Sequence, residues 1–110
     1  MRPAGRFEGK RVLVTGATRG IGFAIAKAFH EEGAFVALNG RTSGSVKSAQ
    51  EKLPGSHMAV ADLATVAGCK SAVISAIDAL GGLDILINNA GIFEKRCLAP
   101  FLSATNFCFL

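Results

Sequence analysis

Three glycines mark the part of the sequence best suited to bind an anion. Gly16, Gly20 and Gly22 lie between an apolar run at residues 12–14 and a helical pattern that begins at Ile21. Glycine has no Cβ to keep the backbone away from a ligand, and the helix start that follows presents free N–H groups and a positive dipole end. The sequence therefore predicts a phosphate-binding turn over residues 15–22. The alternative for glycines at this spacing is an ordinary loop.

The elements that position this turn alternate between strands and helices. Apolar periodicity predicts strands from about residue 11, at 35–39, at 57–61 and from about 84, with helices at 20–32, near 45–53 and from about 66 to 80. Strands separated by helices require right-handed crossovers and therefore form a parallel sheet. We expect an α/β fold, a doubly wound sheet of order 3-2-1-4 that ends after the fourth strand, with a ligand crevice between the first and fourth strands.

The apolar faces of two helices follow from the same periodicity. One recurs every four residues in the first helix and the other runs along the third. The predicted face of the first helix consists of Ile21, Ile25 and Phe29, and that of the third consists of Val66, Val73, Ile77 and Leu80.

A second motif, Asn-Asn-Ala-Gly at residues 88–91, follows the apolar run at 85–87. Together with residues 15–22, and with Asp62 and Leu63 after the third strand, it resembles the cofactor half of the short-chain dehydrogenase/reductase family. The resemblance covers residues 10–93 in the family's order. It implies a partial Rossmann fold and the binding of a nicotinamide dinucleotide.

The resemblance also implies a role for each motif. Thr15 would brace the glycine turn against residues 88–91, and Asp62 and Leu63 would contact the adenine. An alternative for Asp62 is the N-cap of the helix near Thr65. The cofactor-binding residues implied in this way are Thr15, Gly16, Thr18, Arg19, Gly20, Ile21, Gly22, Arg41, Asp62, Leu63, Asn89, Ala90 and Gly91.

The end of the second strand favours NADP over NAD. An acidic residue there would bind the ribose 2′-hydroxyl of NAD, whereas arginine accepts the 2′-phosphate of NADP. The sequence at residues 39–42 is Asn-Gly-Arg-Thr, with no carboxylate. Arg41 offers bidentate phosphate recognition, and Arg19 supplies a second cation from the glycine turn.

The proton-transfer residues of the family are missing from this sequence. Its members use a Tyr-x-x-x-Lys pair and an upstream serine, and these 110 residues contain no tyrosine. We therefore predict no catalytic residue here and no hydride transfer by this chain alone. The competing interpretations are a non-catalytic nucleotide-binding or interaction module and a nonfunctional fragment.

The last residues depart from the family pattern. We divide the chain into a basic lead-in (1–10), the partial dinucleotide-binding domain (11–95) and an apolar, non-family tail (96–110) that carries no charge after Arg96. A frame change, a splice form or a gene truncation would explain this tail. The fourth strand would then be an unpaired edge open to self-association, unless the apolar tail covers it.

Composition excludes several other functions. The net charge of +4 comes mostly from four cations against one carboxylate in residues 1–11, which we interpret as a solvated lead-in and not as a nucleic-acid surface. Cys69, Cys97 and Cys108 lack the spacing of a zinc site or disulfide framework. No apolar stretch is long enough for a membrane span and no signal-peptide core is present, so we predict a cytoplasmic protein without metal, membrane or nucleic-acid partners.

Overall fold

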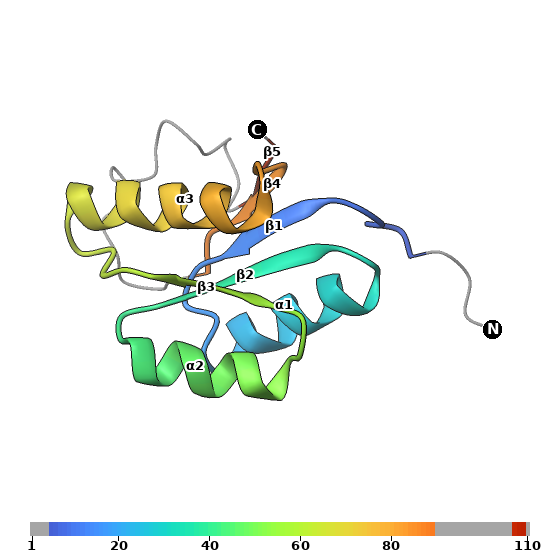
Figure 1. Cartoon of the computed structure of the whole chain (residues 1–110), viewed down its shortest axis with the longest axis horizontal. Coiled ribbons are helices and arrows are strands. Elements are labelled where there is room, and N and C mark those ends of the chain that lie inside the picture. Colours follow the sequence, from blue (N-terminus) through green and yellow to red (C-terminus); the bar gives the residue numbers. More distant parts are fainter. Residues whose placement is uncertain (1–4, 90–106, 110) are drawn as a thin grey trace.

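The fold is an open α/β sheet with helices on both faces. The computed structural model describes residues 5–89 and the backbone of 107–109. The sheet has the strand order β3-β2-β1-β4-β5, and its first four strands are parallel (Figure 1). The strands are β1 (Arg11–Val14), β2 (Phe35–Gly40), β3 (His57–Val60), β4 (Ile85–Ile87) and β5 (Phe107–Phe109). The predicted parallel order 3-2-1-4 is confirmed.

The edge of β4 is covered by another strand. Of the two expectations for this edge, open or covered by the apolar tail, the structure shows the second. β5 pairs with β4 in an antiparallel ladder, with Ile85 opposite Phe109 and Ile87 opposite Phe107. Antiparallel addition supplies hydrogen-bond partners to the backbone groups that an edge strand would leave unpaired. The edge at which we expected self-association is therefore occupied by the chain itself.

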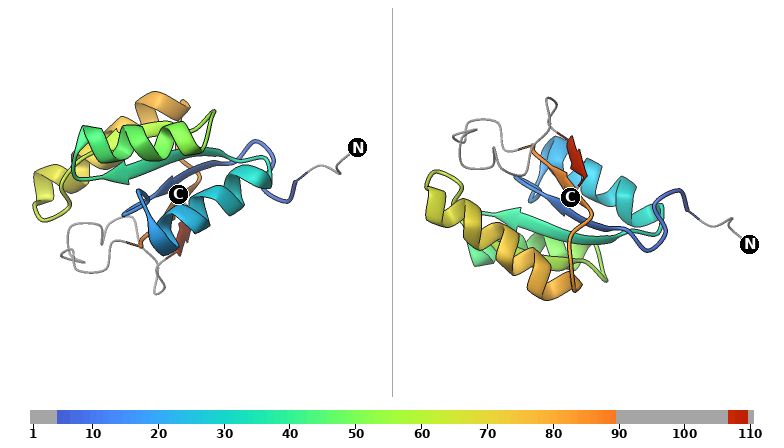
Figure 2. Two further views of the ribbon diagram at one scale, coloured as in Figure 1. Left: turned by 90° about the horizontal axis from the view of Figure 1, so that it is seen from below. Right: turned by 90° about the horizontal axis from the view of Figure 1, so that it is seen from above.

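Three helices cover the sheet. They are α1 (Gly20–Glu31), α2 (Ser43–Lys52) and α3 (Val66–Leu80). α1 and α2 lie on one face and α3 lies on the other (Figures 1 and 2). α2 begins two residues earlier than predicted, because Thr42 accepts a hydrogen bond from the Ser45 N–H and so caps the helix. Within the described residues, no helix is long and apolar enough to cross a membrane.

The strands divide their side chains between two cores. Successive residues of a strand point to opposite faces, so alternate positions meet different helices. Leu13 and Leu86 belong to the core beneath α3, whereas Val12, Val14 and Ile85 belong to the core beneath α1 and α2. Strands buried on both faces explain the nearly continuous apolar runs that predicted them.

The predicted apolar face of α3 is wrong at two positions. Val66 is 57% exposed and Ile77 is 41% exposed, although Val73 is buried as predicted. The residues buried on this helix are mostly small: Cys69, Ala72, Val73 and Ala76. Small side chains let the helix lie close to the sheet, whereas Val66, Ile74 and Ile77 are left exposed.

The prediction for α1 also fails at its first residue. Ile21 is 74% exposed, and the buried residues of α1 are Gly22 and Ala26. Ile25 and Phe29 are partly buried against the core, as the periodicity indicated.

Two arginines at the amino ends of the strands are engaged in ion pairs. Arg11, at the start of β1, donates from Nε to Asp84 Oδ2 at 2.9 Å and from Nη2 to Asp84 Oδ1 at 3.1 Å. Its backbone N–H reaches the same carboxylate at 2.9 Å. These hydrogen bonds lower the pKa of Asp84 to about 2. The second pair joins Arg6 to Glu32 at 3.5 Å.

Candidate nucleotide-binding site

The glycine turn is tied to the end of β4 by Thr15. The Thr15 N–H donates to the carbonyl of Ile87 at 3.0 Å, and Thr15 Oγ1 accepts the Asn89 N–H at 2.8 Å. The Thr15 hydroxyl also donates to the Ile87 carbonyl at 3.3 Å. The brace implied by the family resemblance is therefore present.

The turn needs its glycines for two different reasons, a left-handed backbone conformation and close packing. Gly16 (φ +59°) and Gly20 (φ +60°) adopt the left-handed conformation that glycine tolerates best. A Cβ on Gly22 would lie 2.0 Å from the carbonyl oxygen of Gly16 and 2.4 Å from Nδ2 of Asn89. Asn89 Nδ2 already donates to that same Gly16 carbonyl at 3.1 Å, so Gly22 permits the turn and the end of β4 to meet.

Asn39, which we did not predict as a site residue, organises the same edge. Its side chain is buried; Oδ1 accepts the Gly16 N–H at 3.3 Å, and Nδ2 donates to the carbonyls of Ala59 at 2.9 Å and Ala61 at 3.2 Å. Its own carbonyl accepts the Ala17 N–H at 2.8 Å. One amide on β2 thus joins the glycine turn to the end of β3. An amide at the end of an otherwise apolar strand was the available signal in the sequence.

The N-terminus of α1 differs from those of the other two helices. Thr42 caps α2, and Thr65 caps α3 by accepting the Gly68 N–H at 2.9 Å. Arg19 occupies the N-cap position of α1 and its side chain makes no capping hydrogen bond. The first N–H groups of a helix have no partner within the helix, so those of α1 remain available to an anion.

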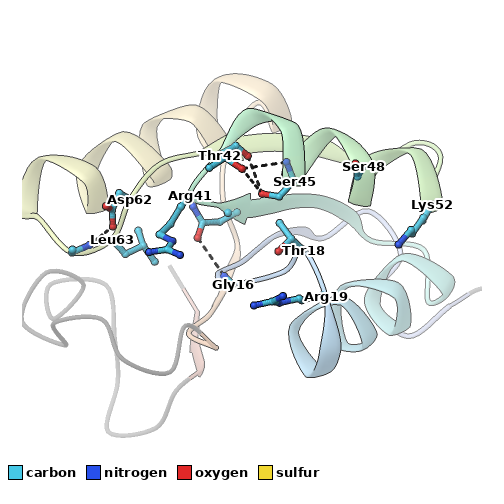
Figure 3. A pocket seen from close by; sticks show the side chains of 13 residues that line it. Gly16, Thr18, Arg19, Arg41, Thr42, Ser45, Ser48, Lys52, Asp62 and Leu63 are labelled. Atoms are coloured by element: carbon cyan, nitrogen blue, oxygen red, sulfur yellow. Dashed lines mark hydrogen bonds between the residues drawn. The ribbon is translucent and has the colours of Figure 1, made fainter.

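A cavity of about 820 Å³ lies in front of this edge. In Figure 3, Arg19 reaches it from the start of α1, Arg41 from the end of β2 and Asp62 from the end of β3. Neither arginine has an ion-pair partner among the described residues, since the two ion pairs there involve Arg6 and Arg11. The lining residues are Gly16, Thr18, Arg19, Asn39, Gly40, Arg41, Thr42, Ser45, Ser48, Lys52, Asp62, Leu63 and Ala64.

The other site residues named from the sequence fall into two groups. Thr15, Gly20, Ile21, Gly22 and Asn89 do not line the cavity but belong to the turn and the β4 end that shape it. Ala90 and Gly91 lie outside the described residues. No trio of metal-ligating side chains gathers anywhere in the described part of the chain.

Asp62 is not the N-cap of α3, because Thr65 holds that position. Its Oδ1 instead accepts the Ala64 N–H at 2.9 Å, which fixes the exposed carboxylate at the mouth of the cavity. Leu63 beside it is buried yet still contributes to the wall. Both residues line the cavity, and their contact with adenine stays a prediction.

A parallel sheet of order 3-2-1-4, with a glycine-rich turn between its first strand and first helix, defines a Rossmann-type α/β domain. The family model described as short chain dehydrogenase matches residues 10–107. The chain therefore belongs to the short-chain dehydrogenase/reductase family. The match extends past residue 96, where we predicted that non-family sequence begins, and the boundary itself stays a prediction.

The relatives are oxidoreductases, and this chain spans only a little over a third of their length. It is 50% identical over 91 residues to glucose 1-dehydrogenase of Gluconobacter oxydans (strain 621H), covering 78% of this chain and 34% of that enzyme. A short chain dehydrogenase from Burkholderia cenocepacia J2315, solved in complex with NADP, is 44% identical with a TM-score of 0.70. That match covers 81% of this chain and 38% of the other.

A third relative was solved with the other nucleotide. The 3-ketoacyl-(acyl-carrier-protein) reductase from Brucella melitensis, complexed with NADH, is 36% identical with a TM-score of 0.73, covering 78% of this chain and 36% of that one. Membership of the family therefore leaves the choice between NAD and NADP to the residues of the site.

Proposed function

We propose that this chain is the NADP(H)-binding half of a short-chain oxidoreductase whose reaction moves a hydride between NADP(H) and a carbonyl or alcohol substrate. The observation that carries the proposal is the pair Arg19 and Arg41, which line one cavity and have no carboxylate partner among the described residues. Two cations without partners beside an uncapped helix N-terminus form a favourable environment for phosphate groups.

The shape of the turn supports the same proposal. A Cβ on Gly20 would meet no atom within 4 Å, so open space lies directly in front of the α1 N-terminus. The dinucleotide pyrophosphate would lie there, against the first N–H groups of α1. The 2′-phosphate of NADP would lie between Arg41 and Arg19, and no acidic residue stands at the end of β2 to repel it.

These residues bind and orient the cofactor, and they do not supply the proton. The bound nicotinamide supplies or accepts the hydride. The hydrogen bonds of Thr15 and Asn89 fix the end of β4, which faces the nicotinamide side in the family arrangement. The phenol that transfers the proton in the family is absent from these 110 residues, so we assign them no proton-transfer step.

Calorimetric titration of the chain with NADPH and NADH tests the proposal. We expect NADPH to bind more tightly, and we expect Arg41→Ala to weaken NADPH by about 10- to 100-fold, the equivalent of charge-assisted hydrogen bonds to one phosphate. NADH affinity should change little, because NADH lacks that phosphate.

A matched control is Lys47→Ala, which removes an exposed cation of α2 that does not line the cavity. Its NADPH affinity should stay within about twofold of the parent chain, as for a screened surface charge. The absence of binding by either nucleotide, or an equal loss in both variants, would contradict the proposal.

A further inference from the structure

At Gly40, the last residue of β2, a side chain would not fit, whereas the backbone conformation does not require glycine. It is buried, and it is not among the glycines with positive φ. A Cβ at this position would lie 2.5 Å from Cγ2 of Thr18 and 2.8 Å from Cγ2 of Val46. Real Cβ atoms do not approach other carbons so closely, and at least one neighbour would have to move.

One neighbour is held by core packing, and the other is held through the backbone beside it. Val46 is fully buried in the core beneath α1 and α2. Thr18 follows Ala17, which is also fully buried and whose N–H donates to the Asn39 carbonyl at 2.8 Å. The glycine turn is thus fastened to β2 one residue before Gly40, which keeps the backbone of Thr18 next to that glycine.

We propose that Thr18 and Val46 exclude every side chain from position 40 and so help to determine the coenzyme. The inference rests on the proposed NADP(H) site, because Gly40 lines the same cavity as Arg41. A carboxylate at the end of β2 is the group that would bind the ribose 2′-hydroxyl of NAD and repel a 2′-phosphate. Preference for NADP then has two parts: Arg41 attracts the phosphate, and the two methyl groups prevent an acid from replacing Gly40.

The binding test compares Gly40→Asp in two backgrounds. One is the parent chain, and the other carries Thr18→Ser and Val46→Ala, which remove both obstructing methyl groups while Ser keeps the hydroxyl. In the parent background we expect Gly40→Asp to weaken NADPH and to raise NADH affinity by less than about threefold. In the relieved background it should raise NADH affinity by about tenfold, the worth of a charge-assisted hydrogen bond.

A gain in NADH affinity that is as large in the parent background as in the relieved one would overturn the proposal. If Gly40→Asp unfolds the parent chain but folds and binds NADH in the relieved background, the proposal is supported.

A stability test needs no nucleotide. The fall in urea midpoint caused by Gly40→Ala should shrink by about half or more when Thr18→Ser and Val46→Ala are present, because contacting residues couple in such a cycle. Gly44→Ala on α2 is the matched control, since a Cβ there meets nothing within 4 Å and its effect should be equal in both backgrounds. Equal falls for Gly40→Ala would refute the exclusion. If the parent chain binds neither nucleotide, the proposed function is wrong. The urea measurements still test whether Thr18 and Val46 exclude a side chain from position 40.

Discussion

The two ends of the sheet each carry a pair of arginines, and the two pairs differ in whether they form ion pairs with carboxylates. At the amino ends of the strands, Arg6 and Arg11 both meet a carboxylate. At the carboxyl ends, Arg19 and Arg41 line a cavity and have no such partner in the part of the chain that the structure describes. Charge that has been neutralised contributes to folding, whereas charge left without a partner is available to a ligand.

The carboxyl end keeps its shape through uncharged groups. Thr15, Asn39 and Asn89 join the glycine turn to β2, β3 and β4 by hydrogen bonds to backbone atoms. Neutral links of this kind position the cations nearby without cancelling them. The comparison therefore predicts that changes at the carboxyl end alter nucleotide affinity, while changes at the amino end alter stability alone.

The largest effect is expected for Gly22→Ala at the carboxyl end. The new Cβ would press on the Gly16 carbonyl and on Asn89 Nδ2, so the turn and the end of β4 must separate. We expect the free energy of unfolding to fall by about 3 kcal/mol, the upper range for an overpacked site, and NADPH affinity to fall by about 100-fold or more. Urea unfolding and calorimetry measure the two effects. A variant that binds NADPH normally would show that the contact does not shape the site.

A different result is expected for Asp84→Asn at the amino end. The folded-state pKa of Asp84 is lowered to about 2 from the ordinary value of 3.8, so the unfolded chain takes up the proton more readily. The stabilisation by this carboxylate is complete above about pH 5 and is lost as the pH falls toward 2. The parent chain should melt at a higher temperature than Asp84→Asn at pH 7, and the two should converge near pH 2. NADPH affinity at pH 7 should be unchanged, and a changed affinity would break the division between the two ends.

The smallest effect concerns the helix starts. Thr65→Ala removes the cap of α3 and should lower the free energy of unfolding by about 1 kcal/mol, with Thr65→Ser restoring it. Arg19→Ala removes a side chain that makes no capping hydrogen bond, so it should weaken NADPH and leave the unfolding midpoint unchanged. A stability loss in Arg19→Ala as large as that in Thr65→Ala would mean that α1 is capped after all.

The order of the parallel strands follows from local information in the sequence, the apolar periods of strands and helices. The crevice that we predicted between the first and fourth strands stays a prediction, because the cavity found among the described residues is lined from the ends of β1, β2 and β3 and from α2. The contact of Thr15 with the end of β4 was accessible only through the family resemblance, since no local pattern joins two residues more than seventy positions apart.

The remaining features depend on packing between distant segments. Hydrophobicity favours Val66 and Ile77 for the buried face of α3, but the close approach of the helix to the sheet selects Cys69 and Ala72 instead. Asn39 looks like any polar residue at a strand end until β3 places two carbonyls beside its amide. Pairing of β5 with β4 likewise depends on a contact between residues that no local period relates.

The position of β1 has a consequence for the order in which the chain folds. β1 is a central strand, and its neighbour β2 follows within about twenty residues, but its other neighbour β4 pairs Val12 with Ile85. Contacts between residues so far apart in the sequence form late, because closing the long loop between them costs conformational entropy before the contact contributes favourable free energy. During synthesis, β1 therefore stays unpaired on one side until β4 has been made. We expect β1, α1 and β2 to form the early nucleus, and the Arg11–Asp84 pair to form only when the sheet closes.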